Sequence, residues 1–160
     1  MTEAADKLWD LMEDNQTCMM VSATPGGGMR ARPMQAILEH DRGEIWFYTR
    51  ISSGKSEELE ADGEVCLCFS CPKTSNYVSI SGRAEVTDDQ AMIEKHWSRF
   101  VDAWFPEGKD GGDVGMIRVT PMLGEYWDGD SSSVLAAIKM LVASERDETP
   151  DLGENRRVAM

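Results

Sequence analysis

The chain has 160 residues, a formal net charge of −13 and 41% hydrophobic residues. This length and hydrophobic content favour a globular fold with a buried core over a disordered chain. The negative charge argues against nucleic acid and anionic membranes as partners, because both reward clustered lysine and arginine. No apolar run is long enough to span a bilayer, and residues 1–11 show no signal-peptide apolar region. We therefore expect a cytoplasmic protein with no membrane partner.

Three or four helices are predicted from apolar spacing and capping residues. The first is an amphipathic helix over residues 3–13. A short helix over 56–61 has Ser53 as its N-cap, and a long helix opens at the capping-box sequence of residues 87–90. The last helix covers about 133–143 and leads into a polar tail. The buried stripe of the long helix is predicted to be Ile93, Trp97, Phe100, Val101 and Trp104.

Alternating apolar and polar residues predict six or seven strands joined mostly by short turns. Short connections make consecutive strands antiparallel, and a small antiparallel sheet of this kind usually closes into a barrel that protects its edges. The sequence therefore predicts an α+β fold that is mainly β. The expected strands are 18–23, 29–39, 44–49, 64–70, 76–86, 114–120 and 124–128, with a turn at 40–43 and Pro121 between the last two strands.

Three of the four cysteines form a C-x-C-x-x-C pattern, Cys66, Cys68 and Cys71, which raises the question of a metal site. A structural zinc site needs four ligands, usually in pairs. Cys66 and Cys68 alternate with apolar residues, so we interpret them as neighbours on one face of a strand. We expect no metal at these cysteines and no disulfide in a reducing cytosol.

A candidate anion site lies at Ser52-Ser53-Gly54-Lys55, before the short helix. A helix N-terminus offers free N–H groups and the positive end of the helix dipole, to which hydroxyls and an ammonium are added here. The spacing is not that of a P-loop, and an ordinary capped surface loop is the alternative interpretation. Arg30 and Arg32 share one face of a strand, and arginine suits bidentate phosphate contacts. Two such clusters among only 16 basic residues favour a phosphate site.

Seven short segments, taken in order along the chain, match those of a known family: residues 32–34, 46–50, 53–55, 77–84, 104–110, 121–128 and 153–156. On these segments the chain resembles the pyridoxamine 5′-phosphate oxidase-like FMN-binding split barrels, most closely their general stress protein 26-like branch. The resemblance implies a split β-barrel of six to seven antiparallel strands, with residues 1–130 as the FMN-binding domain and 131–160 as a C-terminal helix and tail packed on it. It also implies a homodimer with the cofactor at the subunit interface.

The resemblance implies cofactor-binding roles for residues from four parts of the chain. Arg32, Ser53 and Lys55 would hold the FMN phosphate, and Trp127 would approach the flavin from the partner subunit. No side chain stands out as a catalytic acid or base. The other implied cofactor contacts are Pro33, Met34 and Gln35 along the ring, backbone groups of Tyr48 and Thr49, Gly54, and Tyr77.

One departure separates this chain from the oxidases. In them a Glu-Phe-Trp sequence precedes a basic stretch that serves cofactor and substrate, whereas here Glu125-Tyr126-Trp127 precedes the Asp-Gly-Asp-Ser-Ser-Ser sequence of residues 128–133. We therefore expect no oxidation of pyridoxamine 5′-phosphate. The sequence favours a stress-related, FMN-dependent oxidoreductase of unknown substrate. The alternatives are a non-enzymatic flavin-storing or flavin-sensing protein and a barrel that holds a deazaflavin or haem.

Overall fold

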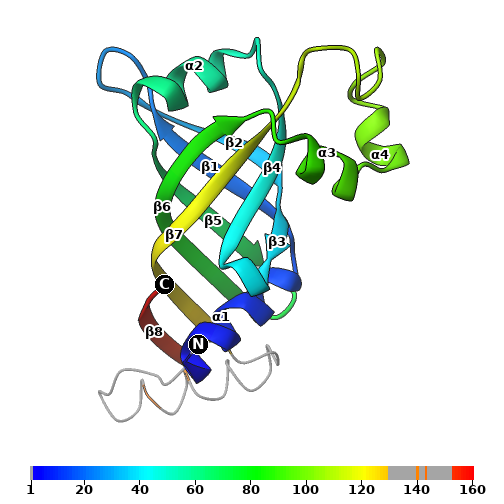
Figure 1. Cartoon of the computed structure of the whole chain (residues 1–160). Helices are drawn as coiled ribbons and strands as arrows, with labels where there is room; N and C mark the ends of the chain where they lie inside the picture. The colour runs from blue at the N-terminus through cyan, green and yellow to red at the C-terminus, as the bar shows by residue number, and fades with distance from the viewer. Residues whose placement is uncertain (1, 130–139, 141–142, 144–152) are drawn as a thin grey trace.

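The computed structural model describes residues 2–129, 140, 143 and 153–160. Its sheet has the strand order β2-β1-β5-β6-β7-β4-β3, with β8 paired to β7, and curls into a half-barrel with α2 at one end (Figure 1). The strands are β1 (Thr17–Ala23), β2 (Met29–Gln35), β3 (Ile37–Glu39), β4 (Glu44–Arg50), β5 (Glu64–Cys71), β6 (Asn76–Thr87), β7 (Val114–Gly129) and β8 (Gly153–Ala159). The helices are α1 (Glu3–Glu13), η1 (His40–Arg42), α2 (Gly54–Ala61), α3 (Gln90–His96) and α4 (Arg99–Asp102).

Residues 29–39, expected to form one strand, instead join the two edges of the sheet. The segment divides at Ala36, so that β2 pairs with β1 and β3 pairs with β4. Ala36 is 1% exposed, and its N–H donates to the carbonyl of Gln16 at 2.7 Å. One continuous segment thereby brings the opposite sheet edges together, which confirms the predicted antiparallel split-barrel class.

β7 runs through Pro121, where the sequence predicted a break between two strands. Pro121 pairs with Gly82, at the point where the register of β6 against β7 shifts between Ser81 and Gly82. This irregularity in the pairing accommodates Pro121, which has no backbone N–H group to donate to the neighbouring strand. A side chain at position 82 would not fit, because its Cβ would lie 2.7 Å from the carbonyl oxygen of Thr120.

β8 was expected to be part of a polar tail, yet it pairs with the C-terminal half of β7 from Leu123 to Gly129. Its burial pattern explains the missed strand, because Val158 is its one buried residue. An edge strand held mainly by backbone hydrogen bonds shows little of the apolar alternation that sequence reading relies on. The helix predicted over 133–143 falls almost entirely outside the described residues.

The predicted long helix is two short helices, α3 and α4. It also begins later than the capping box suggested, since Thr87 remains in β6, paired with Met116 of β7. The actual N-cap of α3 is Asp89, whose carboxylate accepts a hydrogen bond from the Met92 N–H at 3.0 Å. Strand pairing therefore outcompetes the local capping preference of Thr87.

The break between α3 and α4 corrects the predicted buried stripe. Trp97 has extended backbone angles, and the hydroxyl of Ser98 caps α4 by accepting from the Val101 N–H at 3.3 Å. This turn leaves Phe100 86% exposed and Trp104 77% exposed, whereas Val101 still packs in part against the core around Ile93. The serine supplies a cap inside the apolar pattern, and such caps favour a helix start over helix continuation.

The core lies inside the barrel and is closed at one end by α1, which matches the predicted helix. Leu8, Trp9 and Met12 of α1 are at most 1% exposed and pack with the inward-facing side chains of the sheet. A second, smaller core lies between the barrel and α3, around Trp46 and Ile93. α2 lies at the end of the barrel opposite α1 (Figure 1).

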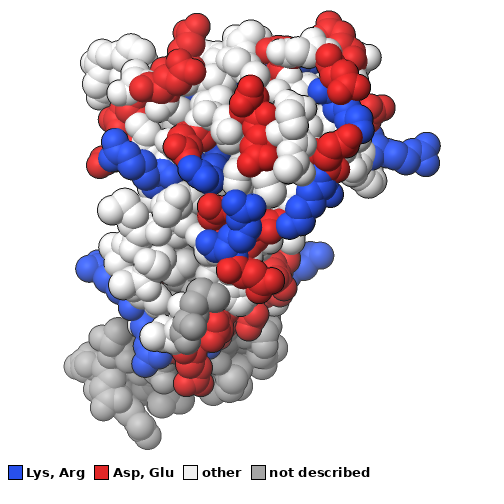
Figure 2. All heavy atoms as spheres, in the orientation of Figure 1, with Lys and Arg blue, Asp and Glu red and all other residues white. Residues whose placement is uncertain are grey.

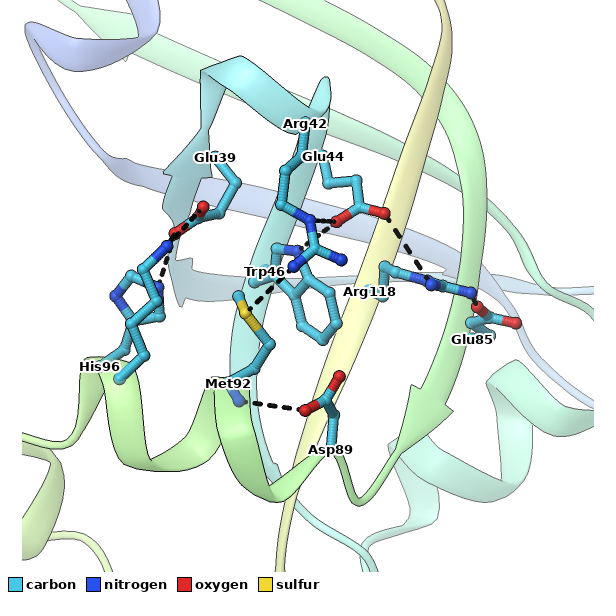
Figure 3. Close-up of polar contacts among 10 residues, drawn as sticks. Glu39, Arg42, Glu44, Trp46, Glu85, Asp89, Met92, His96 and Arg118 are labelled. Atoms are coloured by element: carbon cyan, nitrogen blue, oxygen red, sulfur yellow. Dashed lines mark hydrogen bonds and ion pairs between the residues drawn. The ribbon is translucent and has the colours of Figure 1, made fainter.

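A charged network on the barrel wall contacts α3 through Arg42, which donates to the Met92 thioether at 3.6 Å (Figure 3). Trp46 is 1% exposed, and its indole N–H donates to Glu44 at 3.0 Å. The guanidinium groups of Arg42 and Arg118 lie 5.8 and 5.9 Å from the Trp46 ring centroid. These arginines form ion pairs with Glu44 and Glu85. Because its charges compensate one another, we interpret this network as structural.

Glu39 lies in the same region, and its contacts predict how the stability of the protein changes at acid pH. Its carboxylate accepts hydrogen bonds at 2.7 Å from Lys95 and His96 of α3, and the Lys95 contact, more than His96, holds its pKa below the ordinary value. Glu39→Gln is expected to cost about 1 kcal/mol at pH 7. A depressed folded pKa stabilises above the unfolded pKa, so this difference should vanish as pH falls through the folded pKa. Urea unfolding at pH 7 and pH 3 measures it, with exposed Glu94→Gln as the control and equal losses at both pH values as the contrary result.

Candidate functional site

The N-terminus of α2 gathers hydroxyl groups at one end of the barrel. Ser53 is its N-cap, as predicted, and the Ser53 Oγ accepts from the Ser56 N–H at 3.3 Å. The buried hydroxyl of Thr49 lies 3.4 Å from that of Ser53. At Gly54, the first residue of α2, an added Cβ would meet no atom within 4 Å. The first turn of α2 therefore combines a dipole end with open space beside it.

Lys55 follows in the same turn and is half-buried. Its ammonium donates to the thioether of Met34 at 3.3 Å, and a thioether is a weak acceptor. Burial lowers the pKa of Lys55, and the positive charge of Arg32 lowers it further. No carboxylate of the described residues forms an ion pair with it. This arrangement leaves a desolvated cation beside another cation, which an incoming anion would stabilise.

Arg30 and Arg32 lie on the same face of β2, as predicted, and both contact Glu58 of α2. One terminal nitrogen of Arg32 pairs with the Glu58 carboxylate, and the other donates to the Ser22 hydroxyl at 3.1 Å. Arg30 lies 3.3 Å from the second carboxylate oxygen. The hydrogen bond from Arg32 is the main cause of a lowered Glu58 pKa. The carboxylate is therefore ionised and shared between two arginines.

Sequence reasoning missed Glu58 and Ser22. Neither belongs to a motif, and Ser22 meets Arg32 only because β1 and β2 pair in register. One signal was available for Glu58, since residues three apart on a helix share a face, which places it beside Lys55. No pattern in the sequence predicts that this carboxylate is buried.

The remaining predicted residues of β2 alternate between two faces. Met34 is buried beneath Lys55, whereas Pro33 and Gln35 are exposed on the outside of the barrel. Gln35 accepts a hydrogen bond from the Thr17 hydroxyl at 3.0 Å. β2 thus presents an uncharged outer strip on the face opposite to that of Arg32 and Met34.

The side chain of Tyr48 is engaged away from α2. Its hydroxyl donates to the carbonyl of Ile93 in α3 at 2.7 Å, and burial raises its pKa to about 12. Its ring packs edge-on against Trp97 at a centroid distance of 5.9 Å. Only the backbone of Tyr48 is left for a ligand beside Thr49, which is the kind of contact that was predicted.

Tyr77 and Trp127 are not brought to this site within one chain. They are cross-strand partners in β6 and β7, 43% and 40% exposed. The pair lies near the end of the barrel opposite α2, where β7 pairs with β8 (Figure 1). If Trp127 shares a ligand with Lys55, the two residues must come from different chains.

The cysteines behave as strand residues. Cys66 and Cys68 lie on one face of β5, as predicted, with their sulfur atoms 3.8 Å apart. Burial raises the pKa of Cys68 to about 11. Across the described residues, no group of three or more His, Cys, Asp or Glu is arranged to hold a metal ion. The helices described there also lack the length and hydropathy of a membrane span.

The curled antiparallel sheet, whose two edges are joined by one segment, defines the chain as a split β-barrel, and basic residues gather at one end of it beside the start of α2. The family model described as pyridoxamine 5′-phosphate oxidase like matches residues 3–151, and the chain belongs to this family. Its similarity to general stress protein 26 proteins confirms the branch that the sequence suggested.

Three relatives illustrate the similarity. A structure from Jannaschia sp. CCS1, named as a general stress protein 26, is 28% identical with a TM-score of 0.79, and the match covers 100% of both chains. The general stress FMN/FAD binding protein of Xanthomonas citri is 29% identical with a TM-score of 0.71, over 82% of this chain and 93% of that one. Protein bli-3 of Neurospora crassa is 29% identical over 68% of this chain. The match spans 49% of bli-3, about half its length.

Proposed function

We propose that this protein binds FMN, with the phosphate at the start of α2 between Lys55, Arg32 and Ser53. The observation that carries the proposal is Lys55, a half-buried ammonium whose neighbours are a thioether and a guanidinium. A phosphate monoester, with a charge of about −1.5 to −2, would supply the counter-charge. The open first turn of α2 would add backbone N–H donors. The residues present therefore fit the flavin phosphate, and a relative described as FMN/FAD binding supports the assignment.

The proposed site is completed by a second copy of the chain. The outer face of the barrel carries a strip of uncharged side chains, bordered by Arg83 and the Glu125–Arg157 pair, and Figure 2 shows an uncharged area over the part of the surface where β6 lies in Figure 1. Exposed apolar patches mark interaction sites, and Met19, Leu123 and Trp127 are exposed on this face. A dimer through this face would bring Trp127 of one chain toward the β2 strip of the other. The uncharged side chains of the face include Met19, Ala31, Pro33, Cys66, Cys68, Tyr77, Ser79, Ser81, Leu123 and Trp127.

We further propose an FMN-dependent oxidoreductase of the stress-related class. Bound FMN would supply the electron-transfer chemistry, while the chain binds and orients it. Arg32, Lys55 and Ser53 are assigned to the phosphate, and the hydroxyl of Tyr48 is engaged by Ile93. The chemistry would then proceed without an acid or base from these side chains. Loss of flavin absorbance on adding NADPH without air supports the oxidoreductase, whereas its persistence favours a storage or sensing protein.

FMN should bind about ten- to a hundredfold more tightly than riboflavin. The reason is that only FMN carries the phosphate, and one charge-assisted hydrogen bond contributes about 1.5–3 kcal/mol. Titration of the apo protein with each flavin, followed by fluorescence quenching, measures the ratio. A parallel titration with FAD tests whether the site requires a terminal phosphate. Equal affinities for FMN and riboflavin would remove the phosphate site.

A further inference from the structure

Glu58 is the only buried acidic side chain of the described residues, at 7% exposure, and it lies at the proposed phosphate site. Its carboxylate contacts three donors, the guanidinium groups of Arg32 and Arg30 and the Ser22 hydroxyl at 3.4 Å. Ser22 is itself 1% exposed. A buried carboxylate inside a proposed anion site needs an explanation, because its charge opposes that of the ligand.

We infer that Glu58 is a positioning residue, which holds the Arg32 guanidinium in the orientation that receives the flavin phosphate. The inference rests on the proposed function. It assigns Glu58 no contact with the flavin, since its carboxylate oxygens are already engaged by Arg32, Arg30 and Ser22.

The position of Glu58 on α2 separates it from the expected phosphate. Glu58 lies three residues beyond Lys55, almost one helical turn further from the N-terminal N–H groups. Arg32 contacts Glu58 through one terminal nitrogen and Ser22 through the other. A guanidinium has five N–H donors, so three remain for a phosphate. A fixed planar fork loses less freedom on binding than a mobile one.

Charge balance supports the same assignment. Arg30, Arg32 and Lys55 with one carboxylate leave two positive charges, close to the charge of a phosphate monoester. Without Glu58, three cations would face one another in the apo protein. The carboxylate thus permits the arginines to converge while leaving Lys55 for the ligand.

The test is the affinity of apo protein for FMN and for riboflavin in four single variants and one double variant. Glu58→Gln and Ser22→Ala each remove one contact that holds Arg32, and Ser22→Ala does so without changing a charge. FMN affinity should fall about tenfold in Glu58→Gln and about threefold in Ser22→Ala. Riboflavin affinity should stay unchanged in both. Glu60→Gln removes the same charge from an exposed position of α2 and should change neither. In an Arg32→Met background, Glu58→Gln should have no further effect on FMN, because Glu58 acts through Arg32. Thermal unfolding of each apo variant verifies that it is folded.

The outcomes separate the two proposals. Wild-type protein that fails to prefer FMN over riboflavin overturns the phosphate site, and the role of Glu58 with it. A wild-type preference that survives both Glu58→Gln and Ser22→Ala overturns the positioning role alone. Tighter FMN binding by Glu58→Gln also overturns it, since the carboxylate would then be a competitor of the phosphate.

Discussion

Replacing Lys55 by methionine should weaken FMN binding about ten- to a hundredfold without destabilising the apo protein. The loss follows from one charge-assisted contact to phosphate, about 1.5–3 kcal/mol. The stability result follows from the surroundings of Lys55, which offer a thioether and no carboxylate among the described residues. Methionine keeps the length of the side chain and packs against Met34. FMN affinity should therefore fall at this position while the stability of the apo protein is kept.

The pH dependence of stability gives an independent check. Burial and Arg32 lower the pKa of Lys55, so its protonated form destabilises the apo fold at neutral pH. The unfolded state binds more protons between the two pKa values, and stability there rises with pH. The free energy of unfolding of wild-type apo protein should thus rise relative to that of Lys55→Met as the pH approaches the ordinary pKa of lysine. The control is Lys109→Met, which loses only the exposed pair with Glu94. If Lys55→Met unfolds more easily at pH 7, or binds FMN normally, Lys55 is a structural residue.

Much of the fold was predictable because its local signals agree with its packing. The apolar spacing of residues 3–13 predicts α1, and the serine before the helical segment of residues 56–61 predicts Ser53 as the cap of α2. The alternation around Cys66 and Cys68 predicted their shared strand face. At these positions a residue's immediate neighbours in the chain determine its structure, so periodicity suffices.

Other features depend on distant parts of the chain. Ala36 ends β2 because the sheet must close, and Pro121 stays in β7 because Gly82 lies opposite in β6. Likewise, the pairing of Arg32 with Glu58 arises from packing α2 against β1 and β2. Single-sequence patterns contain no information on such partners. The candidate phosphate donors could be predicted, whereas the carboxylate between the arginines could not.

Trp127→Ala should weaken FMN binding by about thirtyfold, although Trp127 lies far from Lys55 within a chain. A buried tryptophan at an interface typically contributes about 2 kcal/mol or more. We expect the effect to act across the dimer, because Trp127 and Tyr77 lie near the end of the barrel opposite α2. A dimer has two equivalent sites, each built from the β2 and α2 residues of one chain and the Trp127 of its partner.

Mixed dimers test this arrangement directly. A dimer of one Lys55→Met chain and one Trp127→Ala chain, isolated with two affinity tags, should hold one site with both substitutions and one intact site. It should therefore bind about one FMN per dimer with wild-type affinity. Each variant homodimer, in contrast, should have no site of wild-type affinity. If Trp127 instead served its own chain, every site in the mixed dimer would carry one substitution, and no high-affinity binding would return. Light scattering that found only single chains would contradict the shared site before any titration.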